Sequence, residues 1–234
     1  MEAALANPRR EELQRLLLAP GRTLPARPPG APPAPRAETL DNHEISRLLP
    51  PNAAHQGYAL LAKPPEPVDL EDIAEPAEGV ILMLDQVTDP QNIGAILRSA
   101  AAFGARGVIL QDRHSPAIGG ALSKAAAGAV DITPVSRVVN LARALERLSA
   151  LGWRTVGLSG AAEQALDRVL DGSATVLVLG SEGEGLRRLV AEHCDTVAKI
   201  AKAGGLESLN VSAAAAVALY EAAKLAHTAN PIPL

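Results

Sequence analysis

Three short stretches bring together side chains that can orient a substrate and stabilise charge on it. DPQNIGAILR carries Asn92 and Arg98, GSEGEG carries Glu182 between glycines, and LESLN carries Ser208 and Asn210. Amides, hydroxyls and carboxylates place a substrate by hydrogen bonds, and an arginine stabilises negative charge that develops on a reacting oxygen. The three stretches together are therefore candidates for one binding or catalytic site.

Each stretch also has a purely structural explanation. Asn92 suits a helix N-cap and Arg98 an exposed helix charge. Ser208 and Asn210 are likewise good residues for the start of a helix, and Glu182 suits a solvated loop. The residue types alone leave both explanations open, so the argument depends on where the three stretches lie in the fold.

The elements that would hold these residues alternate between strand and helix from residue 79 onwards. Apolar runs predict strands at 80–87, 107–111, 131–135, 154–158, 174–180 and 196–201. Helical spacing predicts helices at 92–103, 121–129, 141–151, 162–170 and 186–193, and a last one after Asn210. Such alternation is typical of a parallel sheet covered on both faces, which binds ligands beyond the carboxyl ends of its strands. All three polar stretches follow predicted strands.

The first part of the chain has a different composition. Thirteen of the 19 prolines fall within residues 1–70, most densely at 25–35. Helices are expected at 2–5 and 42–49 and a strand at 58–62, with a further apolar segment at 13–19. We expect a small α/β unit at 1–63 with a proline-rich insertion at 25–35, a linker at 64–77, and a larger domain at 78–234.

Bulk composition restricts the class of protein. The chain is 47% hydrophobic, has a formal charge of −4 and contains a single cysteine, Cys194. We expect a soluble cytoplasmic protein, because no membrane span or signal peptide is evident in the sequence. The histidines are scattered, so we expect no metal site. RNA contact would need local basic pairs, for which the candidates are Arg187–Arg188, Arg113–His114 and Arg9–Arg10.

A nicotinamide-dependent oxidoreductase is a weaker interpretation. The loop GSEGEG has the spacing Gly-x-x-Gly-x-Gly, whereas the dinucleotide motif is Gly-x-Gly-x-x-Gly and follows the first strand. The loop after the first strand here reads DPQNIG, and the two glutamates of GSEGEG would repel a pyrophosphate.

The segments DPQNIGAILRSAAAFG, LVLGSEGEGLRRL and LESLNVSAAAAVALYE resemble, in order and separation, the three motifs of the SpoU/TrmH family of RNA ribose 2′-O-methyltransferases, of the SPOUT superfamily. The resemblance covers roughly residues 78–226. AHQGYALLAK is similar to the strand that closes the family's L30e-like RNA-binding domain, here in a shortened form. Within the family, the chain looks most like the members that methylate a guanosine of 23S ribosomal RNA.

The resemblance implies a parallel α/β methyltransferase domain with a C-terminal trefoil knot, preceded by the L30e-like domain. It implies S-adenosylmethionine as methyl donor, RNA as substrate, and a homodimer formed through the knotted domain. Arg98 would act on the 2′-hydroxyl, with Asn92, Glu182, Ser208 and Asn210 placing the substrate. The cofactor-binding residues implied are Leu158, Ser159, Gly180, Ile200 and Leu209.

Two points stay open at the level of sequence. An arginine is permanently charged, so Arg98 suits stabilisation of the developing alkoxide or grip of a phosphate better than general-base catalysis. The family usually has proline and an apolar residue after the isoleucine, whereas this chain has Ala201 and Lys202, which predicts a looser cofactor loop. The alternatives are a transfer RNA methyltransferase and a non-catalytic RNA-binding protein of the same fold.

Overall fold

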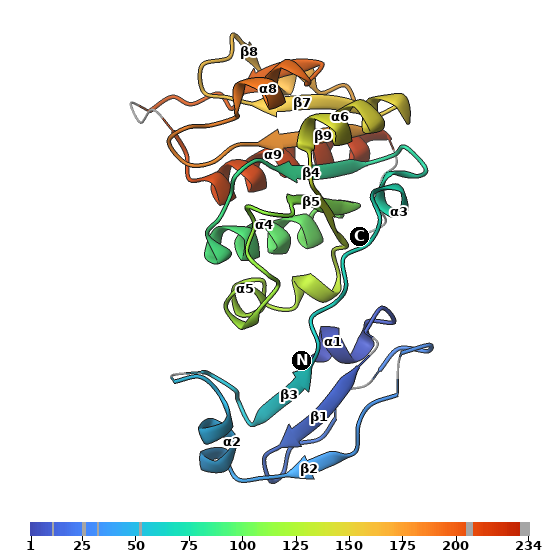
Figure 1. Cartoon of the computed structure of the whole chain (residues 1–234), viewed down its shortest axis with the longest axis vertical. Helices are drawn as coiled ribbons and strands as arrows, with labels where there is room; N and C mark the ends of the chain where they lie inside the picture. The colour runs from blue at the N-terminus through green and yellow to red at the C-terminus, as the bar shows by residue number, and fades with distance from the viewer. Residues whose placement is uncertain (11, 25–26, 32, 52, 205–207, 230–234) are drawn as a thin grey trace. The chain divides into compact units, whose positions relative to one another are not determined.

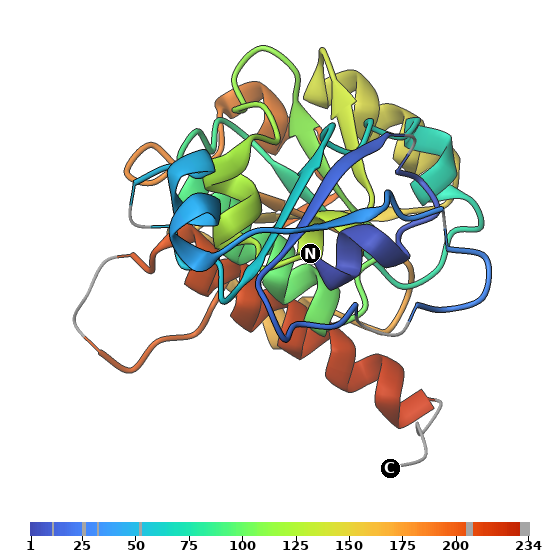
Figure 2. The ribbon, with the colours of Figure 1, turned by 90° about the horizontal axis from the view of Figure 1, so that it is seen from below.

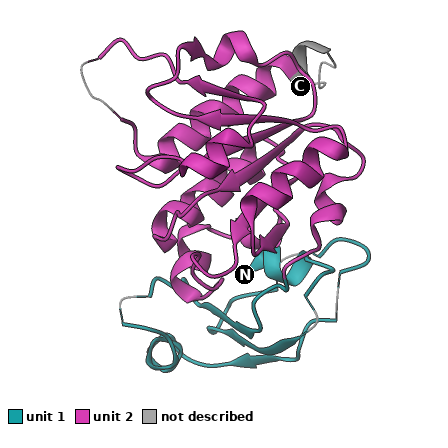
Figure 3. Cartoon of the chain, turned by 45° about the horizontal axis from the view of Figure 1, so that its top comes forward, with its two compact units in different colours: residues 1–66 teal, residues 67–234 magenta. Residues whose placement is uncertain are grey.

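The computed structural model describes residues 1–10, 12–24, 27–31, 33–51, 53–204 and 208–229, with side chains to residue 225. The chain divides into two compact units, Met1–Glu66 and Pro67–Leu234 (Figure 3). Each unit is described separately below.

Unit 1 is built on a three-stranded sheet. Its central strand β1 (Leu13–Leu18) pairs in parallel with β2 (Ala37–Thr39) and antiparallel with β3 (Tyr58–Ala62). The helices are α1 (Glu2–Ala6) and α2 (Asn42–Leu48). Leu17, Ala19 and Ile45 form its small core, so α2 is held to the sheet by Ile45. Asp41 and Glu44 cap α2 by bonding each other's backbone N–H groups.

Unit 2 contains a seven-stranded sheet in the order β6-β5-β4-β9-β7-β10-β8, and every pairing in it is parallel. The strands are β4 (Val80–Leu84), β5 (Gly107–Gln111), β6 (Val135–Val138), β7 (Arg154–Leu158), β8 (Gln164–Ala165), β9 (Thr175–Leu179) and β10 (Thr196–Lys199). The parallel α/β class predicted from the alternating pattern is confirmed. Because β4 and β9 are neighbours, the loops that follow them meet at one edge of the sheet.

Helices cover both faces of this sheet (Figure 1). α4 (Pro90–Ala102), α5 (Gly120–Ala125), α7 (Leu166–Val169) and α9 (Val211–Ala229) contribute to the core on one face, with Leu82 and Leu84 of β4. α3 (Leu70–Ala74), α6 (Leu141–Ala150) and α8 (Arg188–Glu192) contribute to the other, with Ile81 and Met83. Successive residues of β4 thus point to opposite cores, which explains its unbroken apolar run. Figure 2 gives a second view of α9.

Two predicted elements differ from the structure. Residues 131–135 were expected to be a strand, but a 3-10 helix (Ala129–Asp131) occupies the start, and β6 begins only at Val135. The left-handed Gly128 (φ 94°) starts this turn, and the Thr133 N–H closes it on the Ala129 carbonyl (2.8 Å). The predicted helix 162–170 is instead the short strand β8 followed by the one-turn α7, because residues 164–165 pair with the edge of β10.

The segment expected as a linker, 64–77, is largely part of unit 2. Val68 pairs with Ser136, and Ile73 of α3 is buried at 2% exposure. The indole Nε1 of Trp153 donates to the Ala74 carbonyl (2.8 Å), and Arg106 donates to the carbonyl of Ile73 (2.9 Å). Proline and acidic content made this stretch look like a linker, whereas its few apolar residues dock on the sheet.

Candidate functional site

Three of the predicted site residues form one hydrogen-bonded cluster. The Asn210 amide donates to Glu182 Oε1 (2.6 Å) and to Asn92 Oδ1 (3.0 Å). The Asn92 amide donates in turn to the same Glu182 oxygen (3.2 Å). These residues are 28 to 118 positions apart in sequence, so the fold brings them together at the edge where the strands end.

The cluster stands at the starts of two helices. Asp89, and not Asn92, caps α4 by accepting from the Gln91 N–H (3.0 Å), which corrects the expectation that Asn92 is the cap. The Asn92 side chain is therefore available to the cluster. Asn210 does cap α9, because its Oδ1 accepts from the Ser212 N–H (2.9 Å) while its amide nitrogen serves the cluster. Asn210 therefore caps the helix and belongs to the candidate site at the same time.

A tight hairpin presents Glu182. Ser181 and Gly185 exchange backbone hydrogen bonds of 3.2 and 3.0 Å, which leaves Glu182 at the tip. Gly180 lies so close to the returning chain that a Cβ there would meet the Gly185 carbonyl carbon at 2.0 Å. The glycines of GSEGEG thus serve the close approach of the chain to itself and fix the position of the carboxylate.

Arg98 and Ser208 lie outside the bonded cluster. Both side chains are exposed, and neither has a hydrogen bond or ion pair with any residue that the structure describes. Arg98 is on α4, six residues beyond Asn92 and in a later turn. An exposed, unpaired guanidinium is free to meet an anionic ligand.

The predicted cofactor residues follow three neighbouring strands. Leu158 ends β7 and Ser159 follows it, Gly180 follows β9, and Ile200 follows β10. The Ser159 N–H donates to the Ala198 carbonyl (3.0 Å), which joins the ends of β7 and β10. Leu209 is 38% exposed. Of the glycine pair at 204–205 in the same loop, the second lies outside the described residues.

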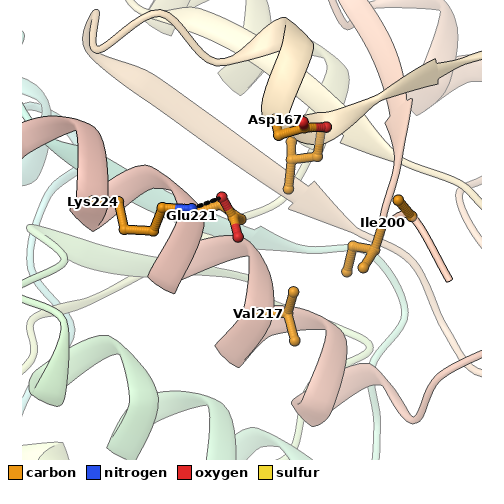
Figure 4. Close-up of a pocket in the computed structure, with 7 residues that line it drawn as sticks. Asp167, Ile200, Val217, Glu221 and Lys224 are labelled. Carbon is orange, nitrogen blue, oxygen red and sulfur yellow. Dashed lines mark hydrogen bonds and ion pairs between the residues drawn. The ribbon is translucent and has the colours of Figure 1, made fainter. Parts of the chain in front are cut away.

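A pocket of about 300 Å³ adjoins this loop (Figure 4). Ile200 and Ala201 form one wall, while Val217, Glu221 and Lys224 of α9 form another. Lys224 and Glu221 are paired at 2.8 Å. Pockets for cofactor-sized ligands begin at about 300 Å³, so this pocket is large enough for part of one.

Sequence reasoning missed an ion pair between a buried aspartate and a partly exposed arginine. Asp85, which directly follows β4, is 0% exposed and accepts from the Arg187 backbone N–H (2.9 Å) and Nε (2.7 Å). Arg187 also donates to the Gln111 side-chain oxygen (3.0 Å). Arg187 was one of the candidate basic residues for RNA contact, and much of its guanidinium is held by these partners. The only signal in the sequence was an aspartate at the end of an apolar strand.

Within the described residues, no group of three or more His, Cys, Asp and Glu side chains could hold a metal ion. The described helices include none with the length and apolar character needed to cross a membrane.

Comparison with known proteins matches residues 79–220 to the SpoU rRNA Methylase family. The 23S rRNA (guanosine-2'-O-)-methyltransferase RlmB of Pseudomonas aeruginosa is 46% identical over 154 residues, 65% of this chain and 62% of that protein. An uncharacterized tRNA/rRNA methyltransferase of Mycolicibacterium gilvum is 39% identical over 190 residues, 79% of this chain and 60% of that protein. The chain thus spans about 60% of the length of these relatives.

Among solved structures, the SpoU methyltransferase AviRb of Streptomyces viridochromogenes in complex with AdoMet superposes with a TM-score of 0.72. It is 28% identical, and the match covers 91% of this chain and 83% of that one.

Proposed function

Because the chain belongs to the SpoU rRNA methylase family, we propose that it transfers a methyl group from S-adenosylmethionine to the ribose 2′-hydroxyl of a guanosine in 23S ribosomal RNA. The Pseudomonas relative, named for this reaction, supports the substrate, and the AdoMet complex of AviRb supports the methyl donor. The observation that carries the proposal is the cluster of Asn92, Glu182 and Asn210, which joins all three motifs at the ends of the strands.

We assign the cofactor site to the loops after β7, β9 and β10. Leu158 ends β7, and Ser159, Gly180 and Ile200 are the first residues after β7, β9 and β10. The pocket beside Ile200 gives room for part of the cofactor. S-adenosylmethionine, when bound, supplies a methyl group on a positively charged sulfur. The residues offered here are mainly backbone and apolar groups, so the loops would hold the cofactor chiefly by main-chain contacts. We also propose that the C-terminal part of unit 2 forms the trefoil knot that the family resemblance implies.

We assign the other residues to the RNA side of the reaction. The 2′-oxygen forms a bond to the methyl carbon as the carbon–sulfur bond breaks, and the hydroxyl proton leaves to a nearby acceptor. Arg98, exposed and unpaired among the described residues, would stabilise the developing negative charge on this oxygen. Asn92, Glu182, Ser208 and Asn210 would hold the nucleotide in line with the methyl group. Orientation of this kind lowers the activation barrier of a reaction by as much as about 7–11 kcal/mol.

The test is methyl incorporation into 23S rRNA from cells that lack this activity. Arg98→Ala should lose incorporation while retaining S-adenosylmethionine affinity by calorimetry. Arg147→Ala is the matched control, because Arg147 is an exposed arginine in the last turn of α6, paired only with Glu71 among the described residues. Equal incorporation by Arg98→Ala and wild type would overturn the role of Arg98. Incorporation into transfer RNA instead would overturn the choice of RNA.

We also propose that unit 1 is the L30e-like RNA-binding domain. It carries eight Lys and Arg residues against seven Asp and Glu, whereas the whole chain is acidic. Arg22 lies over the Tyr58 ring at 5.5 Å, which gives unit 1 a flat cationic surface suited to a base or phosphate. Weaker RNA binding by Arg22→Ala, with unchanged thermal unfolding, is the expected result.

The homodimer is proposed to form through α4 and α9 of unit 2. Phe103 and Tyr220 are 38% and 53% exposed and pack edge to face at 6.1 Å. An exposed aromatic pair on two packed helices is typical of an interface. Tyr220→Lys should lower the mass measured by light scattering from dimer to monomer. Leu48→Lys, at a similarly exposed apolar residue of unit 1, should leave the mass unchanged.

A further inference from the structure

A second, smaller pocket lies beside the Asp85–Arg187 pair. Its volume is about 160 Å³, and residues from the end of β5, the start of α6 and the start of α8 line it. None of the residues lining it is acidic, within the part of the chain that the structure describes. The polar lining residues are Gln111, Asn140 and Arg187. Gln111 is the last residue of β5, so the pocket lies at the carboxyl ends of the strands, as the cluster does. The loops that line the pocket differ from those that carry the cluster.

Arg187 gives this pocket a fixed cation. Its Nε lies against Asp85, and its Nη2 lies against both Asp85 and Gln111. A guanidinium has five N–H donors in one plane, so the Nη1 donors remain without an acceptor among the described residues. The arginine side chain is 41% exposed while Asp85 is fully buried. The ion pair thus orients the guanidinium and leaves its outer edge toward the pocket.

Gln111 adds a donor that is held in place. Its side chain is buried to 8% exposure, and its oxygen accepts from Arg187 (3.0 Å). The oxygen being occupied, the amide nitrogen is the group left over, and it has no acceptor among the described residues. The described residues contain three fully buried side-chain N or O atoms without a partner, and the Gln111 amide nitrogen is not one of them. It therefore keeps some accessible surface and can donate to a ligand. The pocket beside it is where that ligand would lie.

The start of α6 contributes further donors. Asn140 caps this ten-residue helix by accepting from the Arg143 N–H (3.2 Å), so its amide nitrogen is free to donate. The backbone N–H groups of Leu141 and Ala142 also have no acceptor among the described residues, and both residues line the pocket. A helix start carries partial positive charge and binds anions such as phosphate.

We propose that this pocket binds one phosphate group of the RNA substrate. Its polar lining offers donors from Arg187, Gln111, Asn140 and the start of α6. A phosphate group has several acceptor oxygens and a negative charge, so it suits such a set of donors beside a cation. A volume of about 160 Å³ is below the range of about 300–1,000 Å³ for whole small-molecule ligands, so it suits a single group. The exposed Val139 (70%) and Leu189 (54%) at its rim offer apolar contact to the adjoining sugar or base. The assignment of the ligand to RNA rests on the proposed function. The assignment of a phosphate group rests only on the donors that line the pocket.

Two isosteric variants of the full chain test the site. Gln111→Glu keeps an oxygen acceptor for Arg187 but replaces the donor that faces the pocket with a negative oxygen. Asn140→Asp keeps the α6 cap, since aspartate caps as well as asparagine, and likewise adds negative charge. Gln164→Glu makes the same charge change on β8, at the opposite edge of the sheet, and is the control. Thermal unfolding shows whether the variants fold.

Binding is measured with two probes, inorganic phosphate at constant ionic strength and a short single-stranded RNA, both without cofactor. Gln111→Glu and Asn140→Asp should each weaken both probes about tenfold or more, because a like charge opposes the anion, while Gln164→Glu binds as wild type. If folded variants bind both probes as tightly as wild type, the site is overturned. If only phosphate binding falls, the phosphate site stands and its ligand is a free phosphate compound instead of RNA. Since neither probe needs methyl transfer, an inactive enzyme would overturn the proposed function without touching this result.

Discussion

The side chain of Asn210 has two roles, one for the amide oxygen and one for the amide nitrogen. Its oxygen caps α9, and its nitrogen joins Glu182 and Asn92. Asn210→Asp should keep the cap but place a carboxylate oxygen against Glu182, so methyl transfer should fall about a hundredfold by misplacement of the site. Unfolding should move by less than about 1 kcal/mol. Parallel activity and urea-unfolding assays make this measurement.

Asn210→Ala provides the contrast, because it removes both functions. We expect the same loss of activity together with about 1 kcal/mol of stability, the ordinary cost of a lost N-cap. An Asn210→Asp protein that is fully active would show that the cap alone matters and that the cluster is structural.

Cys194 gives a residue-scale prediction about pH. Burial, and then the negative charges of Asp195 and Asp85, raise the pKa of this thiol from 9.0 to about 12. The native thiol should therefore resist alkylation at pH 9, whereas the urea-unfolded chain reacts readily. Because the folded pKa is the higher one, this group's contribution to stability is complete below about pH 9 and is lost as pH rises toward 12. Equal alkylation rates for native and unfolded protein at pH 9 would contradict this environment.

At the scale of elements, apolar runs were the reliable signal. The strands predicted at 58–62, 107–111 and 154–158 have those bounds in the structure, because short β-rich runs bounded by glycine or polar residues have few alternatives. The failures were local. The strand predicted at 131–135 begins only at Val135, because the turn at Gly128 starts a 3-10 helix at Ala129–Asp131. The buried Asp85 pairs with Arg187, 102 positions away in sequence, and no local pattern indicates such a partner.

The loop after β10 carries Ala201 and Lys202, the two residues from which a looser cofactor loop was predicted. Ala201 is exposed and lines the pocket beside Ile200. If the proposed cofactor binds there, Ala201→Pro should stiffen the loop and tighten S-adenosylmethionine binding about two- to fivefold, the effect of about 0.4–1 kcal/mol of restricted backbone freedom. Ala201→Gly, which loosens the backbone, should weaken it. Calorimetry of the three proteins measures the order, and binding by Ala201→Pro no tighter than wild type would refute the idea.

At the scale of the molecule, the boundary between the units decides which pieces can fold. The sequence placed a linker at 64–77, but the structure assigns everything from Pro67 to unit 2. The reason is α3, whose Ile73 and Ala74 are buried against the sheet and whose last carbonyl accepts from Trp153. Composition could not show this, since two buried side chains are enough to dock a short helix.

A fragment of residues 67–234 should therefore unfold cooperatively and bind S-adenosylmethionine as the full chain does, with weaker RNA binding. A fragment of 78–234 lacks α3 and leaves the Trp153 N–H without its acceptor. It should lose about 2.5–6 kcal/mol of stability, from about 1.5–3 for the buried isoleucine and about 1–3 for the unmet donor. Trp153 is the single tryptophan, so its fluorescence in urea reports both unfolding curves. Ile73→Ala in the full chain should lower the free energy of unfolding by about 2–5 kcal/mol, and it separates the effect of lost packing from that of truncation. Equal urea midpoints for the two fragments would instead place the domain boundary at residue 78.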